Sequence, residues 1–231
     1  METKKPVMFR KTSLVDFPGL ISAVIFFPGC NLRCPWCHNR ELVLANSGAG
    51  SIALEKALAH IEKRRRVLKG VVLSGGEPTL FAGLGAVIRR IKSFGLKVKL
   101  DTNGLLPGVL HNLFEAEETR PDYIAMDLKT DPERYGELLP ENDPKAAHPG
   151  TALRQSAALI RASGIAHEFR SLALPSKALP SKTLSNKVLH TALPEPYFGP
   201  QARAALAPLA GDSPWHIRPF VPGNCLDPAW D

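Results

Sequence analysis

Cysteine, aromatic residues and long apolar runs are all scarce in this chain of 231 residues. Only four residues are cysteine, too few for the dense disulfide framework of a small secreted protein. The longest nearly apolar run, residues 20–27, is far shorter than the roughly 20 residues that cross a bilayer. Residues 1–10 are charged and carry no long apolar stretch, unlike a signal peptide. We therefore expect a cytoplasmic protein with no membrane contact.

Acidic residues are outnumbered, because 29 lysines and arginines face 22 aspartates and glutamates, giving a net charge of +7. Such a balance favours anionic partners in general. The densest basic run, residues 63–66, ends a predicted helix, where positive charge is favourable. Aromatic residues make up only 7% of the chain and are not interleaved with this run. We therefore expect no nucleic-acid partner.

Strand-like and helix-like segments alternate along most of the sequence. The predicted strands cover residues 23–27, 71–73, 96–100, 123–126, 166–172 and 215–220. The predicted helices cover residues 51–66 (with Ser51 as the N-cap), 80–94, 107–118, 151–163, and segments around 182–193 and 201–209. This alternation predicts a single α/β domain, residues 1–231, with a parallel sheet and helices outside it.

Three of the four cysteines, Cys30, Cys34 and Cys37, crowd into the segment GCNLRCPWCHN, residues 29–39. Cys34 and Cys37 match the C-x-x-C of redox dithiols, but that chemistry does not need Cys30. Together with His38 they match the c-type haem motif, whose attachment occurs outside the cytoplasm. A structural zinc ion wants four ligands, and the adjacent Cys37 and His38 are awkwardly placed to bind it jointly.

An iron–sulfur cluster is the interpretation that uses all three thiols. The C-x3-C-x2-C spacing can curl a short loop around a cubane so that each sulfur meets a different iron. Three thiolates leave one of the four irons without a protein ligand, and an open position on a metal centre is where chemistry can occur. We therefore predict that Cys30, Cys34 and Cys37 hold a [4Fe–4S] cluster.

The cysteine loop resembles the signature of radical S-adenosylmethionine enzymes. Its flanks KTSLVDFPG, residues 11–19, and CHN, residues 37–39, resemble glycyl-radical-enzyme activating enzymes, in particular the activating proteins of anaerobic ribonucleoside-triphosphate reductase. The resemblance covers about residues 11–172 and resumes over residues 218–228. It implies a partial, open TIM-type barrel of about six βα units that binds S-adenosylmethionine at the open iron.

A glycine-rich segment, SGGEP at residues 74–78, ends the second predicted strand. Gly75 and Gly76 let the backbone come close to a ligand, and Glu77 offers a carboxylate acceptor. The resemblance implies that this segment binds the amino group of the methionine moiety. The alternative interpretation is a tight turn with an incidental acid.

Two more polar segments follow predicted strand ends. Asp101, Thr102 and Asn103 follow the third of these strands, and Asp127 and Lys129 follow the fourth. The resemblance implies that they line the cosubstrate site, with the aspartates near the sulfonium or a cation and Lys129 near the carboxylate. A plain turn after one strand and a surface ion pair after the other are the alternative interpretations.

Three other residues have no assigned binding role. Arg170 resembles a family segment that usually continues with threonines, where this chain has Ser171 and Leu172. His38 is predicted to pack within its loop, and Cys225 to be a thiol outside the cluster. Too few cysteines remain for a second cluster, so a flavodoxin- or ferredoxin-type protein is expected to supply electrons.

The resemblance implies reductive cleavage of S-adenosylmethionine to methionine and a 5′-deoxyadenosyl radical, with no catalytic side chain beyond the cluster. That radical is expected to abstract hydrogen from a glycine of a partner glycyl-radical enzyme, namely anaerobic ribonucleotide reductase. A radical enzyme acting on a small molecule or other protein, and a non-catalytic electron carrier, stay open as alternatives. Residues 173–214 diverge from the family, and residues 177–210 within them are the predicted docking surface. Residues 221–231 are expected to form a C-terminal tail.

Overall fold

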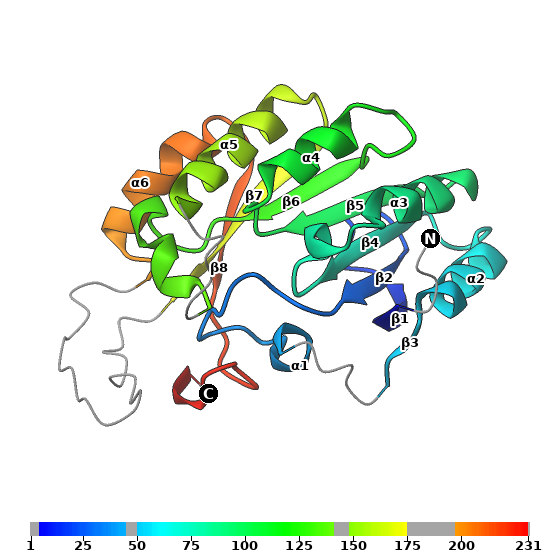
Figure 1. The fold of residues 1–231 in the computed structure, drawn as a ribbon, viewed down its shortest axis with the longest axis horizontal. Helices are drawn as coiled ribbons and strands as arrows, with labels where there is room; N and C mark the ends of the chain where they lie inside the picture. The colour runs from blue at the N-terminus through cyan, green and yellow to red at the C-terminus, as the bar shows by residue number, and fades with distance from the viewer. Residues whose placement is uncertain (1–4, 45–49, 141–147, 175–196, 231) are drawn as a thin grey trace.

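The computed structural model describes residues 5–44, 50–140, 148–174 and 197–230. Its centre is one eight-stranded sheet with the strand order β3-β1-β2-β4-β5-β6-β7-β8 (Figure 1). The strands are β1 (Pro6–Ser13), β2 (Ser22–Phe27), β3 (Ile52–Ala53), β4 (Gly70–Gly75), β5 (Lys97–Thr102), β6 (Tyr123–Asp127), β7 (Ala166–Ala173) and β8 (Trp215–Pro219).

Six neighbouring strands, from β2 through β8, pair in parallel and confirm the predicted α/β fold with a partial, open barrel. The sheet is nevertheless mixed, because β1 pairs antiparallel with both β2 and β3. Neither β1 nor the edge strand β3 was predicted from the sequence. The charged residues Arg10 and Lys11 interrupt the apolar pattern of β1, because residues 10–12 of this strand are exposed.

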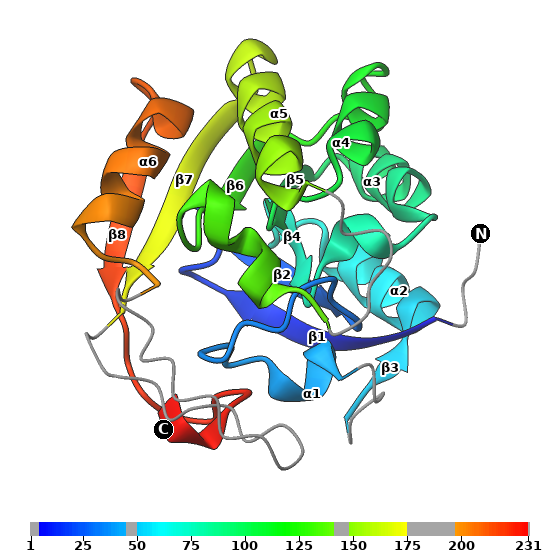
Figure 2. The ribbon, with the colours of Figure 1, turned by 60° about the vertical axis from the view of Figure 1, so that its left-hand side comes forward.

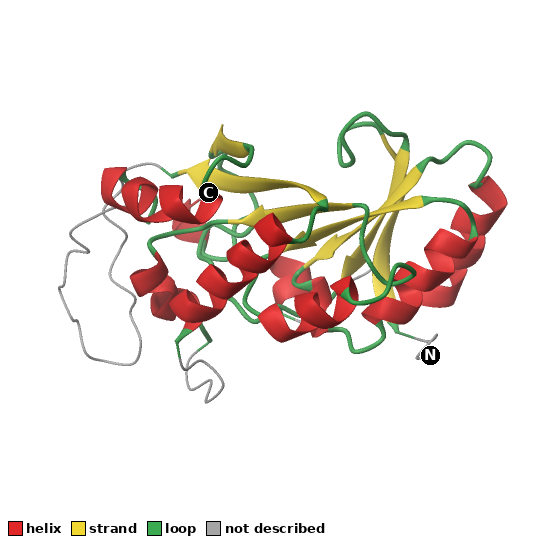
Figure 3. Ribbon diagram, turned by 90° about the horizontal axis from the view of Figure 1, so that it is seen from above, coloured by secondary structure: helices red, strands yellow, loops and turns green. Residues whose placement is uncertain are grey.

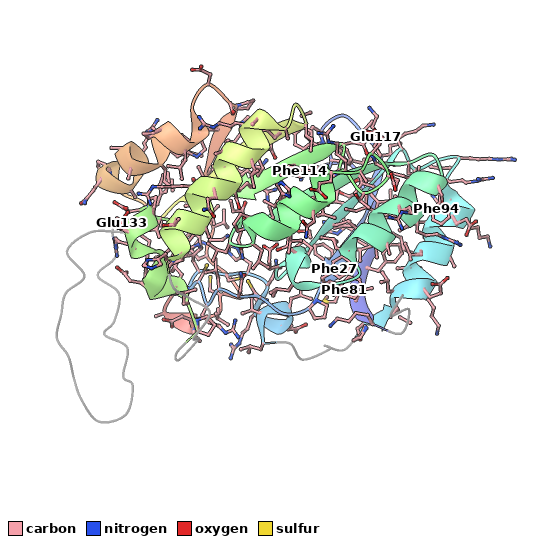
Figure 4. The ribbon with its side chains drawn as sticks, turned by 45° about the horizontal axis from the view of Figure 1, so that its top comes forward. Phe27, Phe81, Phe94, Phe114, Glu117 and Glu133 are labelled. Carbon is pink, nitrogen blue, oxygen red and sulfur yellow. The ribbon has the colours of Figure 1, made fainter. Side chains whose placement is uncertain are left out.

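The helices gather on one face of the sheet (Figures 2 and 3). They are α2 (Leu54–Arg64), α3 (Leu84–Ser93), α4 (Pro107–Phe114), α5 (Pro149–Ala162) and α6 (Pro200–Ala210). Apolar side chains fill the layer between them and the strands. Phe27 of β2 stacks on Phe81 with ring centroids 5.3 Å apart, whereas Glu117 lies at the surface (Figure 4). None of the helices in the described ranges has the length and apolar character that a membrane crossing needs.

Several helix boundaries differ from the predicted ones. Ser51 is not an N-cap, because residues 52 and 53 pair with β1 and α2 begins only at Leu54. A short 3-10 helix, Pro78–Leu80, precedes α3, and α4 ends at Phe114. The expected helix near 201–209 is confirmed as α6. The expected helix at 182–193 lies outside the described residues.

The face of the sheet opposite the helices is concave and partly filled by the loop between β1 and β2. Phe17 of this loop is 4% exposed and packs with Val24 of β2 and Val72 of β4. The β4 residue Gly70 makes room for it, because a Cβ there would come 2.8 Å from the Phe17 ring. The loop thus closes the interior near the strands' N-terminal ends and leaves their C-terminal ends open.

Candidate functional site

A cavity of about 510 Å³ lies at the C-terminal ends of the parallel strands. That is the edge where ligands bind in open α/β sheets and in barrels. All of the site residues predicted from the sequence line it. They are Cys30, Cys34, Cys37, Gly75, Gly76, Glu77, Asp101, Thr102, Asn103, Asp127 and Lys129.

The cysteines lie on the loop between β2 and the short helix α1 (Arg40–Val43). The loop is curled by its own hydrogen bonds. Cys37 N donates to Cys34 O over 3.0 Å, and Arg33 Nη1 donates to the carbonyls of Cys30 and Leu32 over 2.7 and 2.9 Å. All three cysteines of this loop line the cavity.

The thiols are poorly solvated. Burial raises the pKa of Cys30 to about 11 and that of Cys34 to about 12. Both are therefore protonated at neutral pH in the bare chain, and thiolates form there only with a compensating cation. Among the described residues, no three cysteine, histidine or acidic side chains lie close enough to hold a single metal ion. A cubane is larger than one ion, so its three ligands stand farther apart.

The glycine-rich segment packs directly on the cysteine loop. Gly76 N donates to Phe27 O over 2.9 Å, and Glu77 N donates to Gly29 O over 2.8 Å. A Cβ on Gly76 would lie 2.1 Å from Gly29 O and 3.2 Å from Cys30 Cβ. A Cβ on Gly75, whose φ is +128°, would lie 2.3 Å from Phe27 O. Only glycine allows this approach.

Glu77 is 1% exposed and joins the ends of β4 and β5. Its Oε1 accepts from Thr79 N (3.1 Å), Thr79 Oγ1 (2.6 Å) and Thr102 Oγ1 (2.8 Å), and its Oε2 accepts from Asn103 N (2.7 Å). Burial raises its pKa, and these donors oppose the rise. The carboxylate therefore has a clear structural role, and its predicted contact with an amino group stays a prediction.

Asn103 connects the end of β5 to the cysteine loop. Its Nδ2 donates to Asn31 Oδ1 over 2.7 Å and lies 3.9 Å from Cys30 Sγ. Leu32 N also donates to that sulfur over 3.4 Å. Donors to a ligand sulfur stabilise its negative charge and raise the reduction potential of a cluster. The predicted turn at Asn103 therefore also contacts a predicted cluster ligand.

A chain of charges crosses the cavity floor. Asp127 pairs with Lys129 (3.1 Å) and Arg170 (2.9 Å), and Arg170 also reaches Asp101 at 3.6 Å, which Lys99 contacts as well. Burial alone would raise the pKa of Asp127, but the charges of Arg170 and Lys129 outweigh it and lower that pKa to about 2. Burial favours neutral Lys129 and Arg170, yet the facing carboxylates raise the pKa of both. Asp127, Lys129 and Arg170 therefore favour their ionised forms and hold one another in place.

The cavity also has lining residues that the sequence did not single out, among them Asp16, Asn39 and Arg218. Asn39 Nδ2 donates to Gly75 O over 3.2 Å, which ties the end of the cysteine loop to the glycine-rich segment. Asp16 and Arg218 come from a loop and an edge strand. Both fall in segments that resemble the family, which is the signal that could have indicated them. Cys225 is buried and does not line the cavity.

Comparison with known proteins agrees with this geometry. The family model of the radical SAM superfamily matches residues 24–150. A putative glycyl-radical enzyme activating enzyme of Methanocaldococcus jannaschii is 36% identical over 128 residues, which is 55% of this chain and 51% of that protein. The pyruvate formate-lyase 1-activating enzyme of Escherichia coli is 33% identical over 129 residues, 52% of this chain and 50% of that protein. The chain thus spans about half the length of these relatives.

Two further similarities are shorter or more distant. A 7-carboxy-7-deazaguanine synthase of Rhodospirillum rubrum is 42% identical over 91 residues, 39% of this chain and 37% of that protein. The structure of Streptococcus suis SuiB bound to S-adenosylmethionine shares the fold with a TM-score of 0.53 at 14% identity, covering 87% of this chain and 42% of that one. The chain therefore belongs to the radical SAM superfamily, whose cofactors are a [4Fe–4S] cluster and S-adenosylmethionine.

Proposed function

We propose that this chain is an activating enzyme that forms a glycyl radical on a partner protein, with anaerobic ribonucleoside-triphosphate reductase as the partner. The observation that carries the radical chemistry of the proposal is the direct packing of the three-cysteine loop against Gly75, Gly76 and Asn103 at one cavity. Two relatives that match just over half of this chain have names describing activation of such enzymes. The partner and the activity of the whole protein are part of the proposal.

The residues present fit the two cofactors. Three soft thiol ligands face one cavity, and soft ligands are what iron–sulfur clusters take. Gly76 lies against Cys30 where any side chain would block the space. Cys30, Cys34 and Cys37 would hold the cluster, with S-adenosylmethionine beside it. When bound and reduced, these cofactors supply a 5′-deoxyadenosyl radical, which abstracts a hydrogen atom from the substrate.

The chain's own residues would bind the cofactors, orient them and shield them from water. Leu32 N and Asn103 Nδ2 approach the Cys30 sulfur and favour its charged form. Lys129 and Arg170 present cations at the cavity floor for the carboxylate of an amino acid, and Asp127 keeps them in place. Trp36, itself 3% exposed, forms an apolar wall that excludes water.

A second function has one specific observation in its favour. The 7-carboxy-7-deazaguanine synthase has the higher identity, 42%, although over only 91 residues. That name describes synthesis of a small molecule. A radical enzyme with a small-molecule substrate is therefore the alternative to activation of a partner protein.

Anaerobic reconstitution with iron, sulfide, dithionite and S-adenosylmethionine tests the proposal. We expect about four irons per chain and formation of 5′-deoxyadenosine, together with a glycyl doublet by electron paramagnetic resonance once the reductase is added. Replacing Cys30, Cys34 or Cys37 by alanine should abolish cluster binding. Radical formation without a glycyl signal on the reductase would favour the small-molecule alternative. A cluster without 5′-deoxyadenosine would indicate an electron carrier.

A further inference from the structure

A segment distant in sequence holds the second half of the cysteine loop. This segment, residues 220–230, is called the clasp below, and it lies beside the loop in Figures 1 and 2. Asp227 N donates to Pro35 O over 2.9 Å. His38 Nε2 and the carbonyl oxygen of Val221 are 2.8 Å apart. The loop is therefore hydrogen-bonded to the clasp on both sides of Cys37.

Aromatic rings strengthen this contact. Trp36 packs on Trp230 with centroids 5.5 Å apart and on Tyr197 at 4.6 Å. His38 stacks on Phe220 at 5.5 Å, and Phe220 meets Trp230 edge-on at 5.6 Å. Trp36 and Trp230 are 3% and 2% exposed, so their rings form the buried part of an aromatic cluster in which Phe220 is half-buried and His38 is exposed. The two neighbours of Cys37 are thereby both anchored in it.

The two halves of the cysteine loop have different supports. Cys30 is held by Gly76, Leu32 N and Asn103, all close to the sheet. Residues 35–38 form neither helix nor strand, and their hydrogen bonds to described residues outside the loop all lead to the clasp. Fixing an irregular loop in one arrangement costs backbone conformational entropy. Partners from outside the loop must offset that cost for a binding-ready arrangement to exist before the cluster arrives.

We propose that Phe220 and Trp230 are positioning residues, which fix Trp36 and His38 so that the Cys34 and Cys37 thiols face the cavity before the cluster binds. The proposal rests on the assignment of the three thiols as cluster ligands. It does not depend on which substrate the radical attacks. The residues outside a metal's own ligands commonly set how firmly the metal is held.

Substitution of a residue that only stabilises the core and substitution of one that positions the cysteine loop should have different effects on that loop. Phe94 offers a matched control, because it is 8% exposed and has Arg90 over its ring at 5.1 Å. It follows α3 and leads into β5, at the strand ends opposite the cavity. Phe94→Ala should lower the free energy of unfolding about as much as Phe220→Ala or Trp230→Ala, without affecting the cysteine loop.

Two measurements separate these roles. Hydrogen exchange of the apoprotein, which needs no cluster, should show faster exchange in residues 29–39 for Phe220→Ala and Trp230→Ala than for Phe94→Ala. In reconstituted protein, release of iron to a chelator should be about tenfold faster or more in the two clasp variants. Trp230→Phe should restore wild-type behaviour, because the Trp230 indole Nε1 has no hydrogen-bond partner among the described residues.

Equal loop exchange and equal iron release in Phe94→Ala and the clasp variants would overturn the proposal, and so would failure of Trp230→Phe to restore slow release. These outcomes are distinct from failure of the proposed function. A wild-type protein that bound no cluster would contradict the proposed function, while the exchange measurement on the apoprotein would still decide the role of the clasp.

Discussion

Gly76 determines how closely two segments of the site can approach. Its missing side chain is what lets Glu77 N reach Gly29 O at 2.8 Å. We expect Gly76→Ala to lower the free energy of unfolding by about 1–3 kcal/mol, the usual cost of overpacking, and to weaken cluster binding. Chemical denaturation and iron content after reconstitution measure the two effects.

Gly108→Ala is the matched control for that substitution. Gly108 lies in α4 with no atom within 4 Å of an added Cβ. Alanine should therefore stabilise the helix there, by up to about 1 kcal/mol, and leave iron content unchanged. If both variants kept full stability and full iron content, close approach at Gly76 would not matter.

The free energy of unfolding should depend on pH through the ionisation of Asp127. Its pKa is lowered to about 2 in the folded protein, so the unfolded chain takes up its proton at higher pH. The ordinary pKa of an aspartate, about 4, applies in the unfolded chain. The stability that this carboxylate provides is thus fully present above about pH 4 and is lost as the pH falls toward about 2. Asp127→Asn should lower the free energy of unfolding by about 1–2 kcal/mol near neutral pH, with the difference shrinking below about pH 4.

Glu117→Gln is the control for this experiment, because its side chain is 87% exposed and its contact with Lys92 is 4.0 Å long. This substitution should change the free energy of unfolding little at any pH. Denaturation curves of the three proteins between about pH 7 and pH 2 provide the comparison. If the difference in free energy of unfolding between wild type and Asp127→Asn stayed constant over that range, the assigned ion pairs would be contradicted.

Individual site residues were predictable where they follow a strand. Polar residues such as Asp101 and Asp127 come directly after strand-like runs, and parallel strands bring their C-terminal ends to one edge. Asp16 and Arg218 were not predictable in this way. The first reaches the cavity through the path of a loop, and the second through the register of β8 on β7. Neither property is visible in local sequence patterns.

The loop between β1 and β2 is the element that fills the concave face. Phe17→Ala should leave a cavity beside Val24 and Val72 and cost about 3–4 kcal/mol of stability. Cluster content should stay at the wild-type level, because Phe17 does not line the site cavity. Leu14→Ala, at a side chain that is 73% exposed, should change stability by less than about 0.5 kcal/mol. Equal effects of the two substitutions would show that the loop does not fill the interior.

At the level of elements, periodicity predicted the six parallel strands and missed β1, in which residues 10–12 are exposed, and the short edge strand β3. β3 has only two residues, too few for any alternation, and it takes the place of the expected helix start at Ser51. Its pairing with β1 is a tertiary contact, which outweighs the local capping preference of serine. Strands β2 and β4 were predictable because they are buried almost throughout and their sequences are nearly continuous in apolar residues.

The chain carries a net charge of +7, and this charge should affect how fast a charged protein reduces the cluster of the proposed function. An acidic flavodoxin-type donor should reduce the cluster quickly at low salt, because opposite charges speed encounter. The Debye length falls from about 30 Å at 0.01 M salt to about 8 Å at 0.15 M. Stopped-flow reduction should therefore slow about tenfold or more over that range. A zwitterionic viologen, whose one-electron-reduced form carries a single negative charge, should show a much smaller change, and an equal salt effect for both would argue against steering by charge.

The clasp also has a consequence for how the protein is made. His38 and its partner Val221 are separated by 183 positions, so the ribosome exposes the cysteines long before it has added the residues that anchor them. A nascent chain therefore presents Cys34 and Cys37 on a loop that still lacks its clasp contacts, while the contacts of Cys30 with Gly76 and Asn103 come from earlier segments. On the proposed role of the clasp, a fully preorganised site for cluster loading exists only after residues 220–230 have been added and have docked on the loop.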